Sequence, residues 1–134
     1  MADDTAAAAF LAKAERSLAG AESEFVNQRY DNCANRAYYA CFQAAIAALL
    51  DAGITPTTRS GRWRHDFVQA AFSGELVNRR SLYPPSLRPV LGQNAAARHT
   101  ADYGEGSVNE IDAARALMQS RRFLAIVGSK GDRT

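Results

Sequence analysis

The sequence predicts an all-α fold, a compact up-and-down bundle of four to five helices in a single domain. The chain has 134 residues, which is long enough to bury a core of its own. Apolar residues recur at spacings of three and four in several segments, and no segment shows sustained alternation with a period of two. Apolar residues make up 47% of the chain and charged residues 22%, as in ordinary globular proteins.

The first two helices are predicted from their apolar stripes. Residues 5–27 should form the first helix, behind the acidic pair Asp3 and Asp4 that suits a helix N-terminus. Its buried stripe consists of Leu11, Ala14, Leu18, Ala21 and Phe25. Residues 30–52 should form the second helix, which starts near Asp31 and ends at Gly53. Most of its circumference is apolar, so we expect it at the centre of the bundle or at a subunit interface.

The remaining elements follow a loop over residues 54–61. A third helix is predicted from about residue 62 to 72, followed by a less regular stretch over 74–81. A fourth helix should begin at Pro84-Pro85 and end at Gly104, because proline suits a first helical turn. Ser107 and Glu110 have the spacing of a capping box before a last helix. The ordered core should therefore span about residues 5–127, with residues 128–134 as a flexible tail.

Two further features bear on the compartment. Cys33 and Cys41 are eight residues apart on one predicted helix, hence roughly 12 Å along its axis. A disulfide needs Cα atoms within about 7 Å, so we expect two free thiols in the core. No apolar run reaches the roughly 18 residues of a membrane span, and the N-terminus lacks the basic start of a secretory signal. We expect a cytoplasmic protein with no membrane partner.

Charge is distributed unevenly along the chain. Residues 1–55 hold four basic and seven acidic residues, and residues 56–98 hold seven basic and two acidic residues, a net charge of +5. The seven basic residues of the middle segment are all arginine: Arg59, Arg62, Arg64, Arg79, Arg80, Arg88 and Arg98. Arginine's planar fork suits bidentate contact with phosphate. The alternative, an arginine-rich but merely solvated surface, stays open.

Two motifs resemble one branch of the HEPN domain family, the small stand-alone prokaryotic proteins. The first is Ala34-Asn35-Arg36-Ala37-Tyr38-Tyr39-Ala40-Cys41-Phe42, which is similar to that family's Ala-x-Arg-Ala-Tyr-Tyr-Ala-x-Phe helix. The second is Arg98-His99-Thr100-Ala101-Asp102-Tyr103, which looks like its Arg-x-x-Ala-Asp-Tyr signature. With weaker matches around residues 14–22 and His65, the resemblance covers about residues 8–127 in the correct order.

The resemblance implies a HEPN-like helical homodimer in a toxin–antitoxin or defence system that engages RNA or a nucleotide. Many members are metal-independent endoribonucleases, and a nucleotidyltransferase-like antitoxin is the implied partner. The catalytic members carry an arginine, four to six residues and then a histidine, commonly followed by x-Tyr. Here Ala101 stands two positions before Tyr103, where that histidine is expected. The chain has no zinc-type cluster, Glu-x-x-His motif or phosphate-binding glycine loop, so we expect no cofactor and no metal.

Metal-independent RNA cleavage needs a group that moves protons and a cation that stabilises the phosphorane. The tentative catalytic residues are therefore Arg98 for the phosphate and His65 for the proton. Five residues separate Arg59 from His65, which satisfies the family's spacing at a different place in the chain. His99 lies about 100° from Arg98 around a helix and is expected at the surface. A structural role for His65 stays open.

The expected binding residues are Arg36, Tyr39, Asp102 and Tyr103. Asp102 lies four residues after Arg98, so the two form either an ordinary intrahelical ion pair or a pair that directs Arg98 into a cleft. In a two-fold dimer these groups would meet their symmetry copies. The alternative to a ribonuclease is a non-catalytic helical dimer that binds a nucleotidyltransferase-like partner or a small nucleotide.

Overall fold

The computed structural model describes the backbone of residues 4–57, 60–103 and 107–131, and their side chains except those of residues 4, 97, 100–103, 130 and 131. Within this part of the chain every regular element is helical, as predicted. The elements are α1 (Asp4–Val26), α2 (Tyr30–Asp51), α3 (His65–Ala71), the π-helix η1 (Phe72–Arg79), the 3₁₀ turn η2 (Pro85–Leu87), α4 (Val90–Tyr103) and α5 (Glu110–Gly131). None of the described helices is long and apolar enough to cross a membrane.

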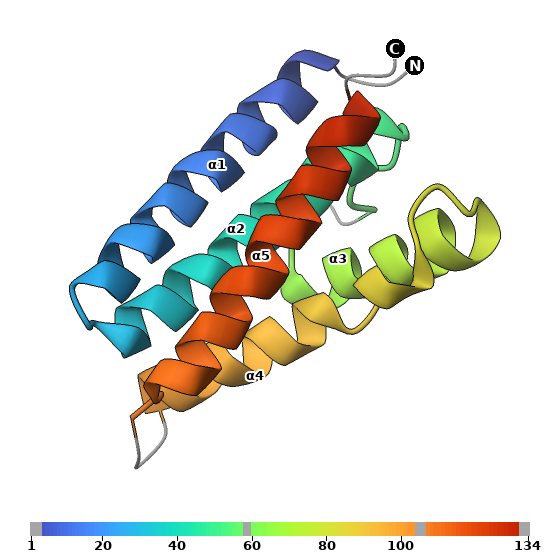
Figure 1. The fold of residues 1–134 in the computed structure, drawn as a ribbon. Coiled ribbons are helices and arrows are strands. Elements are labelled where there is room, and N and C mark those ends of the chain that lie inside the picture. Colours follow the sequence, from blue (N-terminus) through green and yellow to red (C-terminus); the bar gives the residue numbers. More distant parts are fainter. Residues whose placement is uncertain (1–3, 58–59, 104–106, 132–134) are drawn as a thin grey trace.

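Helix α2 lies at the centre of the bundle, which confirms the prediction from its apolar circumference. Helices α1, α4 and α5 all pack against it (Figure 1). Alanine and cysteine fill much of its buried surface, and such small side chains let neighbouring backbones approach closely. Larger side chains fill the space beyond it, among them the fully buried Phe72, Leu91 and Phe123. Residues from α1, α4 and α5 therefore come together around α2.

A buried polar network joins α2, α4 and α5. Asn94 of α4 donates from Nδ2 to Sγ of Cys41 at 3.2 Å and to Oγ of Ser120 at 3.1 Å. Ser120 Oγ also lies 3.0 Å from the carbonyl oxygen of Ala37 and 2.9 Å from that of Ala116. Buried polar groups are costly unless they are paired, so this network fixes the axial position of α4 against its neighbours. Both cysteines are free and buried, as predicted.

The middle of the chain differs from the prediction. Helix α3 is only seven residues long, and the stretch expected to be irregular continues it as the π-helix η1. The spacing of apolar residues in the sequence does not distinguish a π-helix from an irregular segment. In the structure, the i→i+5 hydrogen bonds of η1 place Phe72, Leu76 and Val77 in the core. The fourth helix is also split, because Pro84 and Pro85 lead into η2 and α4 begins only at Val90.

Helix α5 begins and ends later than predicted. Its N-cap is Asn109, whose Oδ1 accepts a hydrogen bond from the amide of Asp112 at 2.7 Å, so the capping box at Ser107 was wrong. Asp31 accepts a 2.7 Å hydrogen bond from the amide of Val108, and buried Val108 joins Ala113 in one apolar cluster. This contact resembles a hydrophobic staple and sets the helix start two residues further on. The helix also continues to Gly131, through four residues expected in the tail.

Candidate functional site

Tyr38 is the centre of the candidate site. It lies on α2 and is only 4% exposed. Its hydroxyl oxygen lies 2.9 Å from Nδ1 of His65, the first residue of α3. The ring of Phe42, one helical turn after Tyr38, stacks on both Tyr38 and His65 with centroid distances of 5.8 and 6.5 Å. The imidazole is therefore held by one hydrogen bond and two ring contacts.

Arg98 approaches the same tyrosine from α4. Its Cζ lies 5.1 Å from the centroid of the Tyr38 ring and 5.3 Å from that of Tyr39. Its Nε donates to Oδ1 of Asn35 at 3.2 Å. Cation–π contacts contribute about 0.5–2 kcal/mol each, depending on solvent exposure. We call Asn35, Tyr38, Tyr39, His65 and Arg98 the Tyr38 cluster.

The electrostatics keep Tyr38 neutral at physiological pH. Burial raises the pKa of its phenol, Arg98 lowers it, and Tyr39 raises it, with burial as the largest effect. A neutral phenol can either donate to Nδ1 of His65 or accept from it. When Tyr38 donates to Nδ1, the proton of the neutral imidazole lies on Nε2, which can then donate it. When Tyr38 accepts from Nδ1, Nε2 lacks a proton and can accept one. Nε2 can therefore act as a general acid or as a general base.

Arg36 also lies on α2, and its side chain lies against α1. A Cβ atom on Gly20 would come within 3.0 Å of Nη1 and 3.1 Å of Cδ of Arg36. The missing side chain of Gly20 thus leaves room for the arginine to lie across α1. Glycine inside a helix costs roughly 1 kcal/mol relative to alanine, so Gly20 makes room for Arg36 but destabilises α1.

The comparison with protein families decides the identity of this bundle. The model of the HEPN domain matches residues 7–130, nearly the whole chain. The chain belongs to the HEPN domain family. At the level of the family, this supports a role related to RNA or nucleotides, of the toxin–antitoxin kind. Among curated proteins, no sequence matches the chain.

The structure of this HEPN domain brings three of the six predicted site residues together. Arg98, His65 and Tyr39 all belong to the Tyr38 cluster, with the arginine over the tyrosine ring and the histidine at its hydroxyl. Arg36 lies beside Gly20, outside this cluster, and lines a pocket together with Asn35 and Tyr39. The side chains of Asp102 and Tyr103 lie outside the described residues, as does Arg59, so the two interpretations of the Arg98–Asp102 pair stay open. His99 is exposed, as expected.

Sequence reasoning missed the residues that hold the HEPN site together. Asn35 fixes Arg98, and Phe42 stacks on His65, yet neither was predicted as a site residue. A signal was present, because Tyr38, Tyr39 and Phe42 follow Asn35 by three, four and seven residues and therefore share one side of α2. Tyr38 is buried and also contacts both candidate catalytic side chains.

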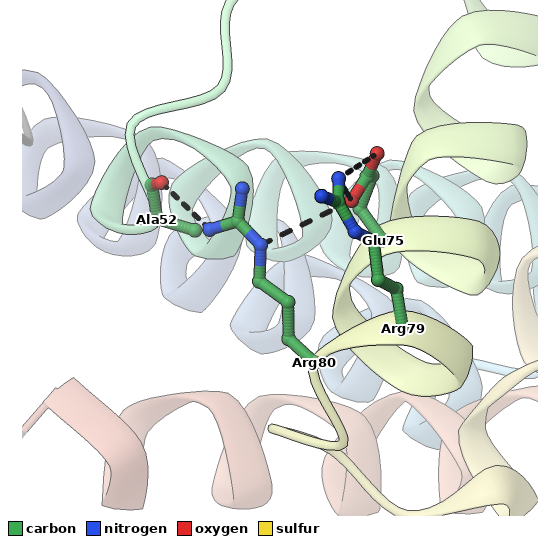
Figure 2. Close-up of polar contacts among 4 residues, drawn as sticks. All are labelled: Ala52, Glu75, Arg79 and Arg80. Atoms are coloured by element: carbon green, nitrogen blue, oxygen red, sulfur yellow. Dashed lines mark hydrogen bonds and ion pairs between the residues drawn. The ribbon is translucent and has the colours of Figure 1, made fainter.

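Three other arginines of the middle segment serve the fold of the HEPN domain. Arg79 and Arg80 share the carboxylate of Glu75 at 3.2 and 3.9 Å, and Arg80 donates to the carbonyl oxygen of Ala52 at 3.1 Å (Figure 2). Arg80 thereby satisfies the C-terminal end of α2, where a cation is favourable. Arg88 donates to Asn78 at 2.6 Å. The alternative of a structural, solvated role thus fits these three, whereas Arg98 contacts the aromatic rings of the candidate site.

Proposed function

We propose that this HEPN domain is the RNA-engaging component of a prokaryotic toxin–antitoxin or defence system and acts as a metal-independent endoribonuclease. One observation carries the proposal: a single side chain, Tyr38, contacts both the Arg98 guanidinium and the His65 imidazole. These are the two functions that RNA cleavage without a metal requires, a cation for the phosphorane and a group for proton transfer.

The proposed reaction is an internal transesterification. The 2′-hydroxyl loses its proton to Nε2 of His65, and its oxygen attacks the adjacent phosphorus. The bond to the 5′-oxygen breaks, that oxygen takes up a proton from water, and a 2′,3′-cyclic phosphate remains. Arg98 stabilises the negative charge on the non-bridging oxygens. Asn35 holds Arg98 in place through its Oδ1, and Asp102 and Tyr103 are proposed to complete the cleft.

A homodimer is part of the proposal. Ile111 and Met118 are large apolar residues on α5 with exposed fractions of 67% and 65%. They are seven residues apart, hence on one side of the helix. Exposed apolar residues gathered on one face are typical of an interaction surface. A monomer in sedimentation equilibrium at micromolar concentration would contradict this part of the proposal.

A second candidate function is a non-catalytic dimer that binds a small nucleotide or a nucleotidyltransferase-like antitoxin partner. The observation that favours it is Ala101, which stands where catalytic members of the family carry histidine. In that case Arg98, Asp102 and Tyr103 would organise the binding surface, and no reaction would take place there.

Induced expression of matched variants distinguishes the two functions. Wild type should arrest growth and degrade RNA, whereas Arg98→Ala and His65→Ala should do neither. His99→Ala is the matched control, since it removes an exposed imidazole adjacent to Arg98 and should stay toxic. Purified protein should cut RNA in excess EDTA, and circular dichroism should show that every variant folds. Wild type that neither arrests growth nor cuts RNA, with no antitoxin present, would sink the ribonuclease and favour the binding module.

A further inference from the structure

A polar groove adjoins the Tyr38 cluster between α1 and α2. Its volume is about 430 Å³, and its lining residues are Ser17, Asn32, Asn35, Arg36, Tyr39 and Gln43. Small-molecule sites in proteins have volumes of roughly 300–1,000 Å³. Two lining residues, Asn35 and Tyr39, also belong to the Tyr38 cluster, so the groove and the cluster are continuous. We call it the α1–α2 groove.

The groove contains one cation that the described residues do not neutralise. Arg36 is exposed and forms no ion pair with any residue that the structure describes. The nearby acidic side chains are engaged elsewhere, Glu22 with Arg121 at 3.3 Å and Glu24 with Arg29 at 3.6 Å. Because its side chain lies against Gly20, the guanidinium is held beside α1. Such a group is suited to a phosphate.

The groove also offers an aromatic ring and an amide. Tyr39 is 38% exposed, and Arg98 covers part of its ring. Asn35 uses its oxygen to accept from Arg98, and in the described part of the chain its amide nitrogen has no hydrogen-bond partner. Stacking on an aromatic side chain is worth about 1–3 kcal/mol per nucleobase. An amide N–H can bind the acceptors on a base edge.

We propose that the α1–α2 groove binds one nucleoside monophosphate unit, with its phosphate on Arg36 and its base against Tyr39 and Asn35. The unit is either one nucleotide of an RNA strand beside the bond to be cut or a free mononucleotide. The inference builds on the proposed function, because it gives the Tyr38 cluster a neighbouring subsite. It also explains the glycine in α1, where a side chain would displace Arg36.

The test uses a steric variant with a matched control. Gly20→Leu fills the space that Arg36 occupies and should displace the guanidinium. Gly128→Leu makes the same change on α5, where an added Cβ meets nothing within 4 Å. Both variants should keep or raise the melting temperature, since leucine favours helix over glycine. Arg36→Ala removes the cation directly.

Binding is measured with three kinds of probe. One is a fluorescent 2′-O-methyl oligoribonucleotide, which cannot be cut through its 2′-position; the others are AMP, GMP, CMP and UMP, and ribose 5-phosphate. Gly20→Leu and Arg36→Ala should raise the dissociation constant of the oligonucleotide about 10-fold or more, as expected for loss of a charge-assisted contact. Gly128→Leu should match wild type. Ribose 5-phosphate should bind far more weakly than the nucleotides.

The outcomes separate the subsite from the catalytic proposal. If Arg98→Ala weakens RNA binding but Gly20→Leu and Arg36→Ala do not, the groove inference is overturned and the ribonuclease stands. If the two groove variants weaken binding while wild type cuts no RNA, the subsite holds and the ribonuclease fails. If the two groove variants also weaken binding of the mononucleotides, the ligand is a free nucleotide. If they weaken binding of the oligonucleotide alone, the ligand is one nucleotide of an RNA strand. Wild type that binds none of the probes, or ribose 5-phosphate as tightly as nucleotides, overturns the inference.

Discussion

Tyr38 donates to, or accepts from, His65 across a distance of 2.9 Å between its hydroxyl oxygen and Nδ1 of the imidazole. This contact joins the centre of α2 to the first residue of α3. It leaves Nε2 as the nitrogen available to a ligand. Because Tyr38 also lies beneath Arg98, one side chain sets the positions of both candidate catalytic groups.

Tyr38→Phe tests this relationship. The change removes the hydroxyl but keeps the ring under Arg98 and against Phe42, so the free energy of unfolding should fall by only about 1 kcal/mol. The balance between the two imidazole tautomers should shift, which ¹⁵N-detected NMR of the histidine ring reports, and RNA cleavage should drop. Tyr30→Phe is the control, since it removes an exposed hydrogen bond to Glu110. An unchanged ring spectrum in Tyr38→Phe would contradict a directing role for the hydroxyl.

Asn35 is predicted to act on Arg98 as a positioning residue. Asn35→Ala removes the acceptor for Nε of Arg98, a charge-assisted hydrogen bond worth about 1.5–3 kcal/mol, so kcat for RNA cleavage should fall roughly 10- to 100-fold. Asn35→Asp restores an acceptor and should recover much of the loss. Asn27→Ala removes an exposed amide of the same type and should have no effect. Equal activity of Asn35→Ala and wild type would rule this role out.

The sequence was sufficient for the long helices but not for the contacts between them. Apolar periodicity predicts α1 and α2 to within about one residue, because each buries one broad face against the core. The π-helix η1 was missed, since its identity depends on hydrogen bonds that follow packing of Phe72 and Leu76. Arg98 and His65 could be chosen by their chemistry. That both contact Tyr38 could not be predicted, because these contacts require the packing of α3 and α4 on α2.

The start of α5 allows the cap predicted from the local sequence, Ser107, to be compared with the cap found in the folded structure, Asn109. Asn109→Ala removes the observed cap and should cost about 1 kcal/mol of unfolding free energy. Ser107→Ala changes an exposed side chain at the position that the sequence favoured, and it should change stability by less than about 0.5 kcal/mol. Urea denaturation of both variants measures the difference. A larger loss in Ser107→Ala would restore the capping box.

Stability should decline at alkaline pH because of the buried thiol in the polar network. Burial raises the pKa of Cys41 from 9.0 to about 11, although hydrogen bonds with Ser120 and Asn94 lower it. Between these values the unfolded chain loses a proton that the folded chain keeps, so the free energy of unfolding falls as pH rises from 9 to 11. The loss attributable to this group is on the order of 2–3 kcal/mol by pH 11.

Urea denaturation at pH 8, 9, 10 and 11 measures this dependence, and Cys41→Ala isolates it. The variant loses the hydrogen bond from Asn94 and should be less stable at pH 8, so the comparison rests on the slope with pH and not on the absolute stability. Its slope between pH 9 and 11 should be shallower than that of wild type. Cys33, whose pKa burial also raises to about 11, and Tyr83, raised by burial to about 12, titrate in both proteins and cancel. Identical slopes would show that Cys41 ionises as easily in the folded chain as in the unfolded one, and the network would then not exclude a charged thiolate.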